Sequence, residues 1–137
     1  MDTRTPAKRS EIMSAVRTKD TGPELLVRKL LSAQGYRYRL HRKDLPGRPD
    51  IVFPSQHKAI FVHGCFWHGH RCKKGRLPKS RLRYWRPKIL ANKKRDARNL
   101  AILRRLGWGV LTVWQCHLKD QDTMSRKIHR FLKKDNQ

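Results

Sequence analysis

The sequence predicts a single α/β domain in which a small mixed β-sheet is flanked by helices. Its length of 137 residues suits one domain. Segments with a helical spacing of apolar residues lie toward both ends of the chain, and short apolar runs typical of strands lie between them. Helices that bury one face against a sheet are a stable way to combine such elements.

Two helices are expected in the first quarter of the chain. Residues 9–18 carry an apolar stripe at helical spacing, and a stronger helix begins after Thr21. Thr21 is suited to cap this second helix, Pro23 fits its first turn, and Glu24 occupies the position that completes a capping box. Gln34-Gly35 ends the helix, because glycine favours the backbone turn that follows a helix.

Short strands are expected in the middle of the chain. Residues 36–40 alternate between apolar and basic side chains, as a strand does. Residues 50–54 and 58–63 predict two further strands, and their short connection favours antiparallel pairing. Residues 64–80 show neither the helical spacing of apolar residues nor the alternation of a strand, so we expect an irregular segment there.

The last third of the chain predicts a helix, a strand and a helix. The first of these runs from Pro87 to Leu106 and ends at Gly107. Residues 108–114 predict a buried strand that places two tryptophans in the core, and residues 121–133 predict an amphipathic helix. The side chains expected to face inward are Ile89, Leu90, Leu100, Leu103 and Leu106 on the long helix and Trp108 and Trp114 on the strand.

The charge balance predicts a polyanionic partner. The chain carries 34 Lys and Arg against 10 Asp and Glu, a formal net charge of +24. Nucleic acid is the expected partner, because basic side chains that neutralise phosphates release counterions. No run approaches the roughly 20 apolar residues of a membrane span, and the first residues lack the apolar core of a signal peptide. We therefore expect a cytoplasmic protein rather than a membrane or secreted protein.

A dense group of cysteine and histidine residues predicts a metal site. The segment HGCFWHGHRC (63–72) holds two Cys and three His, and a third Cys follows the last strand. Zinc prefers four such ligands in a tetrahedron, and a closed set of four protein ligands indicates a structural role. The predicted Zn²⁺ ligands are Cys65, His70, Cys72 and Cys116. The alternative is three structural cysteines without a metal.

Two histidines and one acid remain for chemistry. His63 and His68 are not needed for zinc, and neutral imidazoles can move protons near pH 7. Asp50 is the only acid between Asp44 and Asp96, and it stands at the start of a predicted strand. A carboxylate close to DNA phosphates is useful when a cation bridges them, and Mg²⁺ is bound through one or two carboxylates. The alternatives are solvated loop histidines and a capping aspartate.

These motifs resemble the very short patch repair (Vsr-type) DNA mismatch endonucleases. The matching segments include GRPDIVF (47–53), IFVHGCFWHGHRC (60–72), YWRPKI (84–89) and LGWGVLTVWQC (106–116). The resemblance implies a restriction-endonuclease-like core with catalytic Mg²⁺ and structural Zn²⁺. It assigns Mg²⁺ binding to Asp50 and the backbone carbonyl of Val62, and active-site roles to His63, His68 and Glu24. It also implies the same four zinc ligands that were predicted above from the Cys and His residues.

The resemblance further implies how DNA is handled. Phe66, Trp67 and Trp85 match side chains that wedge into the base stack beside the mismatch. Residues 1–20, with Lys8, Arg9 and Arg17, match a segment that contacts DNA from the minor groove, and residues 21–134 match the nuclease core of a single-domain enzyme. We expect a bacterial, nucleoid-associated monomer that nicks 5′ of the thymine in a T·G mispair. Its expected genetic companion is a cytosine-5 DNA methyltransferase, since such mispairs arise from deaminated 5-methylcytosine.

Two other functions fit part of the sequence. One is a related nuclease with relaxed preference for mismatched or distorted duplexes, which differs from the first expectation only in substrate. The other is a non-catalytic, zinc-stabilised nucleic-acid-binding module. That module explains the charge and the cysteines but leaves Asp50, His63 and His68 without a role.

Overall fold

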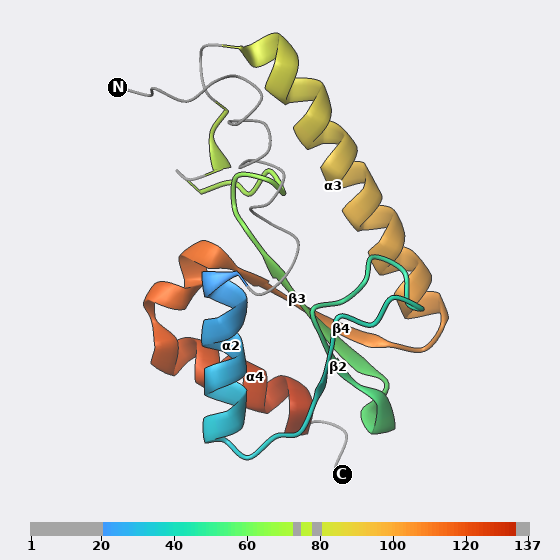
Figure 1. Cartoon of the computed structure of the whole chain (residues 1–137), viewed down its shortest axis with the longest axis vertical. Helices are drawn as coiled ribbons and strands as arrows, with labels where there is room; N and C mark the ends of the chain where they lie inside the picture. Colours follow the sequence, from blue (N-terminus) through green and yellow to red (C-terminus); the bar gives the residue numbers. More distant parts are fainter. Residues whose placement is uncertain (1–20, 73–74, 78–80, 134–137) are drawn as a thin grey trace.

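The structure is a computed structural model that describes residues 21–72, 75–77 and 81–133. The helix predicted at 9–18 and the DNA-contacting segment predicted at 1–20 lie outside the described residues. The described elements, in chain order, are α2 (Gly22–Ala33), β1 (Arg39–Leu40), β2 (Ile51–Phe53), the 3-10 turn η1 (Pro54–Gln56), β3 (Lys58–His63), α3 (Leu82–Arg105), β4 (Gly109–Trp114), the 3-10 turn η3 (Gln115–Lys119) and α4 (Gln121–Lys133) (Figure 1).

The four strands form one mixed sheet in the order β1-β2-β3-β4. β1 and β2 pair antiparallel, as do β2 and β3, whereas β3 and β4 pair parallel. The predicted mixed sheet and its antiparallel hairpin are therefore confirmed. The strand predicted at 36–40 is shorter in the structure, because only Arg39 and Leu40 pair with β2; Tyr36 and Tyr38 pack against the apolar core instead.

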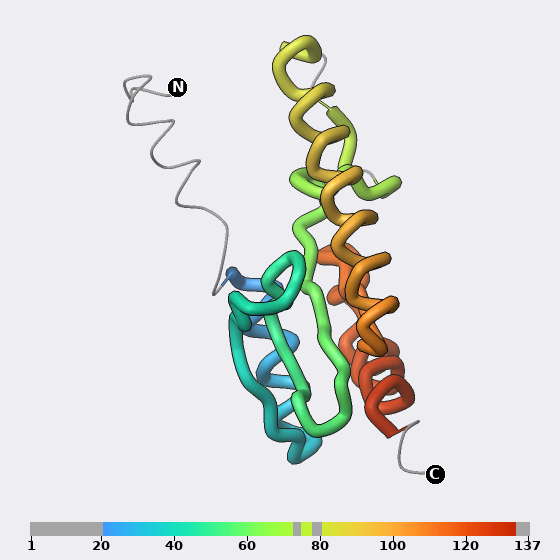
Figure 2. Tube along the Cα trace, turned by 90° about the vertical axis from the view of Figure 1, so that its right-hand side faces the viewer, coloured from blue at the N-terminus to red at the C-terminus, as the bar shows by residue number. Residues whose placement is uncertain are grey.

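Helices cover both faces of the sheet. α2 and α4 lie on one face, and α3 runs along the other, as the two views at right angles show (Figures 1 and 2). The main apolar core lies on the α2 and α4 side, where each fully buried aliphatic side chain contributes about 1.5–3 kcal/mol. Its buried members are Val27, Leu31, Ile51, Phe53, Ile60, Val113, Leu118, Met124, Ile128 and Leu132.

The start of α2 follows the predicted cap. The Thr21 Oγ1 accepts a hydrogen bond from the backbone N–H of Glu24 at 3.3 Å, and Pro23 stands in the first turn. The Glu24 side chain does not close the reciprocal half of a capping box. Its carboxylate binds Arg28 and His41 instead, so the cap fixes the helix start and leaves this acid free to enter a site.

The α3 helix differs from its prediction in two ways. It begins at Leu82, five residues before Pro87, which stands inside it. Packing of Trp85 against the segment after β3 explains why helix forms ahead of the proline. Ile89 and Leu103 are buried as expected, but Leu90 and Leu106 are 49% and 59% exposed. The N-terminal half of α3 extends beyond the end of the sheet (Figure 1), so only a narrow stripe of the helix is covered.

The last strand and the last helix form where the sequence predicts them. β4 starts one residue after the predicted 108, and α4 has the predicted bounds. The core assignment of the two tryptophans was wrong, because Trp108 and Trp114 are only partly buried. Among the described residues, no helix is both long and apolar enough to cross a membrane.

Candidate active site and metal clusters

Asp50 lies at the start of β2 and is held from the neighbouring strand. Its Oδ2 accepts a hydrogen bond from the backbone N–H of Val62 at 2.7 Å. Glu24, which is 1% exposed, reaches the same place from the first turn of α2. One ligand atom from each of Glu24, His41 and Asp50 lies within 4.8 Å of the others. The structure thus brings together the two acids that the sequence analysis assigned to the site and adds a histidine.

The surroundings of Asp50 favour its protonated form when no cation is bound. Burial is the largest cause and, together with the neighbouring Glu24 carboxylate, raises the pKa of Asp50 from 3.8 to about 7, while the Val62 N–H opposes this change. Two acids placed side by side in the interior repel each other when both are ionised. A divalent cation removes that repulsion, so this donor set fits Mg²⁺, which prefers oxygen ligands.

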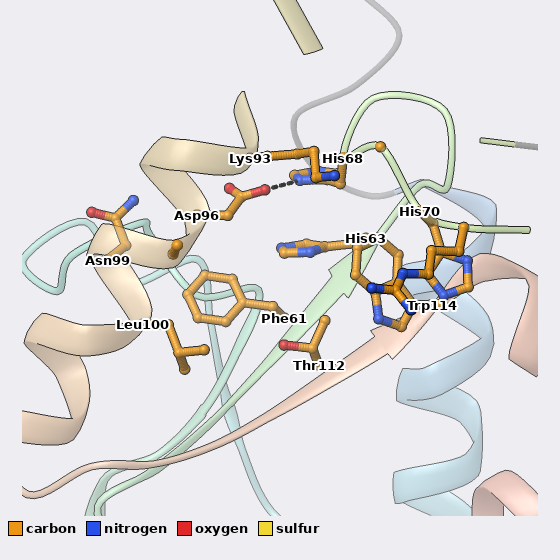
Figure 3. A pocket seen from close by; sticks show the side chains of 13 residues that line it. Phe61, His63, His68, His70, Lys93, Asp96, Asn99, Leu100, Thr112 and Trp114 are labelled. Atoms are coloured by element: carbon orange, nitrogen blue, oxygen red, sulfur yellow. Dashed lines mark hydrogen bonds and ion pairs between the residues drawn. The ribbon is translucent and has the colours of Figure 1, made fainter. Parts of the chain in front are cut away.

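His63 and His68 lie against each other beyond the end of β3. Their rings are parallel, with centroids 3.7 Å apart and an interplanar angle of 1°. The Nδ1 of His68 is 2.6 Å from the Oδ2 of Asp96, which reaches over from α3 (Figure 3). The carboxylate therefore fixes the orientation of the His68 ring through Nδ1, and Nε2 is the ring nitrogen that it does not bind.

His63 is the more enclosed of the two imidazoles. His63 is only 8% exposed, and its Nδ1 has no hydrogen-bond partner among the described residues. Burial, followed by the adjacent His68, lowers the pKa of His63 from 6.5 to about 3. His63 is therefore neutral at physiological pH.

A cavity of about 480 Å³ opens beside the histidines, between α3 and the strands β3 and β4. Trp114 lines it, because the parallel pairing of the strands sets Trp114 next to His63. The ring of Trp114 also stacks on His70, with centroids 4.3 Å apart. Its position explains why the core assignment failed: the Trp114 side chain lies between His63 and His70 and contacts both rings (Figure 3).

The four predicted zinc ligands come together. The donor atoms of Cys65, His70, Cys72 and Cys116 all lie within 4.8 Å of one another. The Sγ of Cys116 is 3.5 Å from the Nδ1 of His70. This distance agrees with the separation of about 3.6 Å expected between a sulfur and a nitrogen ligand of the same tetrahedral zinc ion. The backbone N–H of His70 donates to the carbonyl of Cys65 at 2.9 Å and closes the loop between two of the ligands. The donor chemistry and the spacing both fit Zn²⁺.

A glycine lets this loop approach α3. Gly69 has φ +62°, in the left-handed region, and lies between His68 and His70. A Cβ there would lie 2.6 Å from the Cδ of Lys93 and 2.9 Å from the Cγ2 of Ile89, closer than packed atoms allow. Glycine therefore permits one histidine to face Asp96 while the other turns to the cysteines.

The three predicted wedge residues form one cluster of rings. Phe66, Trp67 and Trp85 contact each other edge to face, with centroid distances from 5.1 to 5.7 Å, and all three are partly exposed. Asn92 on α3 donates a hydrogen bond to the backbone carbonyl of Trp67 at 2.9 Å. The ammonium of Lys88 lies 5.7 Å from the Trp67 ring and 5.9 Å from the Trp85 ring. The result is an aromatic surface with a positive charge over it.

Sequence reasoning missed four residues of this region: Arg28, His41, Asp96 and Trp114. Asp96 had a usable signal, because it is the one acid among fifteen Lys and Arg in residues 71–105. An acid kept within such a basic segment deserves the same reasoning that singled out Asp50. His41 and Trp114 gain their positions through contacts between distant segments, which local patterns do not encode. Arg28 lies one helical turn after Glu24 on α2, a spacing at which an ion pair could have been predicted.

Sequence comparisons with known proteins agree on one family, and a structural comparison supports the fold. The sequence profile of the family described as DNA mismatch endonuclease Vsr matches residues 1–74. The Type II nicking enzyme V.XorIIP of Xanthomonas oryzae pv. oryzae is 56% identical over 131 residues, 96% of each chain. The DNA mismatch endonuclease Vsr of Escherichia coli K12 is 41% identical over 124 residues, 90% of this chain and 80% of the relative. The catalytic domain of homing endonuclease I-Bth0305I has a similar fold, with a TM-score of 0.57 at 22% identity over 84% of this chain and 94% of that domain.

Proposed function

The chain belongs to the Vsr family of DNA mismatch endonucleases and is a DNA endonuclease, and on this premise we propose that it nicks one strand of duplex DNA on the 5′ side of the thymine in a T·G mispair. The observation that carries the proposal is that two neighbouring residues of β3, Val62 and His63, contact the acid site and the histidine pair respectively. The N–H of Val62 holds Asp50, and the next residue, His63, stacks on the Asp96-bound His68. A cation site therefore adjoins a proton-transfer pair.

Asp50, with the carbonyl of Val62, is proposed to hold Mg²⁺, and Glu24 lies beside them. When bound, the cation supplies electrostatic stabilisation of the charge that builds on phosphorus and the leaving oxygen. The two carboxylates supply the negative charge that such a cation needs in a chain with a formal net charge of +24.

The histidines are proposed to manage the proton of the attacking water. His68, oriented by Asp96 through Nδ1, accepts or orients that proton through its other nitrogen. His63 stays neutral and limits the movement of the His68 ring by stacking on it. Water adds to phosphorus as the bond to the 3′ oxygen breaks, which leaves a 5′-phosphate and a 3′-hydroxyl.

Zn²⁺ is proposed to be structural and to be held by Cys65, His70, Cys72 and Cys116. With four protein ligands the ion has no open position for a substrate. The ligands join the loop after β3 to Cys116 in η3, so the ion would fix the loop that carries His68.

The aromatic cluster is proposed to insert into the base stack at the mispair. Unstacking costs a few kcal/mol and is cheapest at a mispaired step, so a wedge discriminates through DNA deformability. Phe66, Trp67 and Trp85 supply the rings. Residues 1–20, with Lys8, Arg9 and Arg17, are proposed to contact the opposite groove of the DNA, and residues 21–134 to form the nuclease core of a monomer. The proposed genetic companion is a cytosine-5 DNA methyltransferase.

A strand-resolved nicking assay with Mg²⁺ tests the substrate. Labelled duplexes carry either one T·G mispair or the matched C·G pair in several sequence contexts. Nicking confined to the thymine strand, just 5′ of the mispair, is the expected result. Equal cutting of both duplexes would show the relaxed nuclease instead, and binding without any cut in every context would show the non-catalytic module.

A matched pair of acid variants tests the chemistry. Asp50→Ala is expected to abolish nicking and to keep most of the duplex affinity. Asp44→Ala is the control, because Asp44 is an exposed acid paired with Arg42. Mg²⁺-dependent nicking that persists in Asp50→Ala contradicts the assignment of Asp50.

A further inference from the structure

The Glu24 carboxylate has two basic partners and lies beside Asp50. The guanidinium of Arg28, one helical turn further along α2, pairs with Oε2. The Nε2 of His41 lies 2.9 Å from the same oxygen. Both basic groups thus converge on Oε2 of a residue that is 1% exposed. Arg28 and His41 are themselves mostly covered, at 16% and 24% side-chain exposure.

His41 is tied to Asp50 as well as to Glu24. Its backbone N–H donates to the carbonyl of Asp50 at 3.1 Å, directly after the pairing of β1 with β2. Its φ of +50° lies in the left-handed region, which is uncommon for residues other than glycine and persists when surrounding contacts fix it. One residue therefore connects the main chain of one acid to the side chain of the other.

The geometry favours His41 as a hydrogen-bond donor over a direct cation ligand. The Nη2 of Arg28 is 3.4 Å from the Nε2 of His41. A divalent cation on that nitrogen would lie close to the guanidinium, and like charges at that separation repel strongly in a buried site. A proton on Nε2 that is donated to the Glu24 Oε2 avoids the conflict.

We propose that Arg28 and His41 are positioning residues, which hold the Glu24 carboxylate turned toward the divalent-cation site of Asp50. This inference rests on the proposed function, because it assumes that the acids bind a cation. Outer partners of metal-binding groups typically change metal affinity by roughly 10- to 100-fold when they are lost. The two residues therefore set the cation concentration that the enzyme needs.

Two substitutions of His41 separate positioning from simple packing. His41→Gln keeps an N–H donor at about the reach of Nε2, whereas His41→Asn tolerates the left-handed backbone but is too short to reach Glu24. We expect His41→Asn to raise the Mg²⁺ concentration for half-maximal nicking roughly tenfold or more, with a much smaller change in kcat at saturating Mg²⁺. His41→Gln should restore most of the apparent affinity.

A binding measurement without DNA supplies the second readout. Mn²⁺ is titrated into Zn²⁺-saturated protein and followed by electron paramagnetic resonance of free Mn²⁺, with thermal melts to show that each variant is folded. His41→Asn should weaken Mn²⁺ binding by the same factor as its Mg²⁺ requirement. Arg28→Met is a less clean test, because it loosens Glu24 but also removes a positive charge that repels the cation.

The outcomes distinguish a failure of the proposed positioning role from a failure of the proposed function on which it rests. Wild-type protein that neither binds Mn²⁺ nor needs Mg²⁺ for nicking would overturn the proposed function itself. Cation-dependent wild-type protein together with unchanged affinity in His41→Asn would overturn only the positioning role. Equal loss in His41→Asn and His41→Gln would also overturn it, because the donor restored by glutamine would then be irrelevant.

Discussion

Replacing Asp50 by asparagine should make the cation-free protein more stable while it removes the activity. The pKa of Asp50 is raised from 3.8 to about 7, chiefly by burial and then by Glu24. At about 1.4 kcal/mol per pH unit, ionising this carboxyl in the folded state at pH 8 costs about 4 kcal/mol relative to the unfolded chain. Asparagine keeps an oxygen that can accept the Val62 N–H and carries no charge. We expect a gain of about 2–4 kcal/mol in unfolding free energy at pH 8.

The pH dependence of this gain has a definite sign. Between pH 3.8 and about 7 the folded chain holds a proton on Asp50 that the unfolded chain has released, so the wild-type stability falls as pH rises through this window. The variant lacks this group. The difference between the two proteins should therefore be smaller at pH 5 than at pH 8 by about 2 kcal/mol.

Urea denaturation in buffer that contains Zn²⁺ but no Mg²⁺ measures the difference. Asp44→Asn serves as the control and should remain close to wild type, because Asp44 is exposed at the surface. Added Mg²⁺ should stabilise the wild type and leave Asp50→Asn unaffected, by mass action on the folded state. The reasoning is refuted if Asp50→Asn is no more stable than wild type at pH 8, or if its advantage does not shrink at pH 5.

Four further outcomes can be checked. Leu103→Ala should lower the unfolding free energy by about 2–4 kcal/mol, whereas Leu90→Ala on the same helix should change it by less than about 0.5 kcal/mol, since Leu90 is 49% exposed; urea melts compare them. Asp96→Asn should slow single-turnover nicking by roughly 100-fold or more, and an equal loss of duplex affinity would argue against a role in chemistry. Cys116→Ser should lose bound zinc in elemental analysis and melt at a lower temperature. Trp85→Ala should reduce the preference for binding T·G over C·G duplexes by roughly tenfold in a titration, and an unchanged preference would exclude Trp85 from the wedge.

The sequence predicts the parts of the fold that local chemistry decides. Thr21 caps α2 because its hydroxyl accepts the N–H three residues on, and the bounds of α4 follow from an apolar stripe that one helix can bury completely. The hairpin of β2 and β3 follows from two apolar runs and a short connection. Each of these signals lies within about 15 residues of chain.

The remaining features depend on contacts between distant segments. Helix α3 starts before Pro87 because Trp85 packs on a loop about 20 residues earlier, and the apolar stripe of this helix continues past the sheet that covers it. His68 meets Asp96 across 28 residues, and His41 meets Glu24 across 17. No periodicity within one segment can reveal such pairs, so the pairing of His68 with Asp96 and that of Glu24 with His41 could be identified only in the fold.

A single short loop links the proposed recognition of the mispair to the proposed hydrolysis. Cys65 and His70 anchor its two ends in the cysteine cluster, and the residues between them include Phe66, Trp67 and His68. Asn92 holds the backbone of Trp67 from α3, and Asp96, one turn further along the same helix, holds His68. We therefore expect a displacement of the two aromatic rings to move the adjacent imidazole as well. DNA that resists the wedge would leave His68 poorly placed, so the preference for a deformable mispaired step can act on the rate of cleavage as well as on binding.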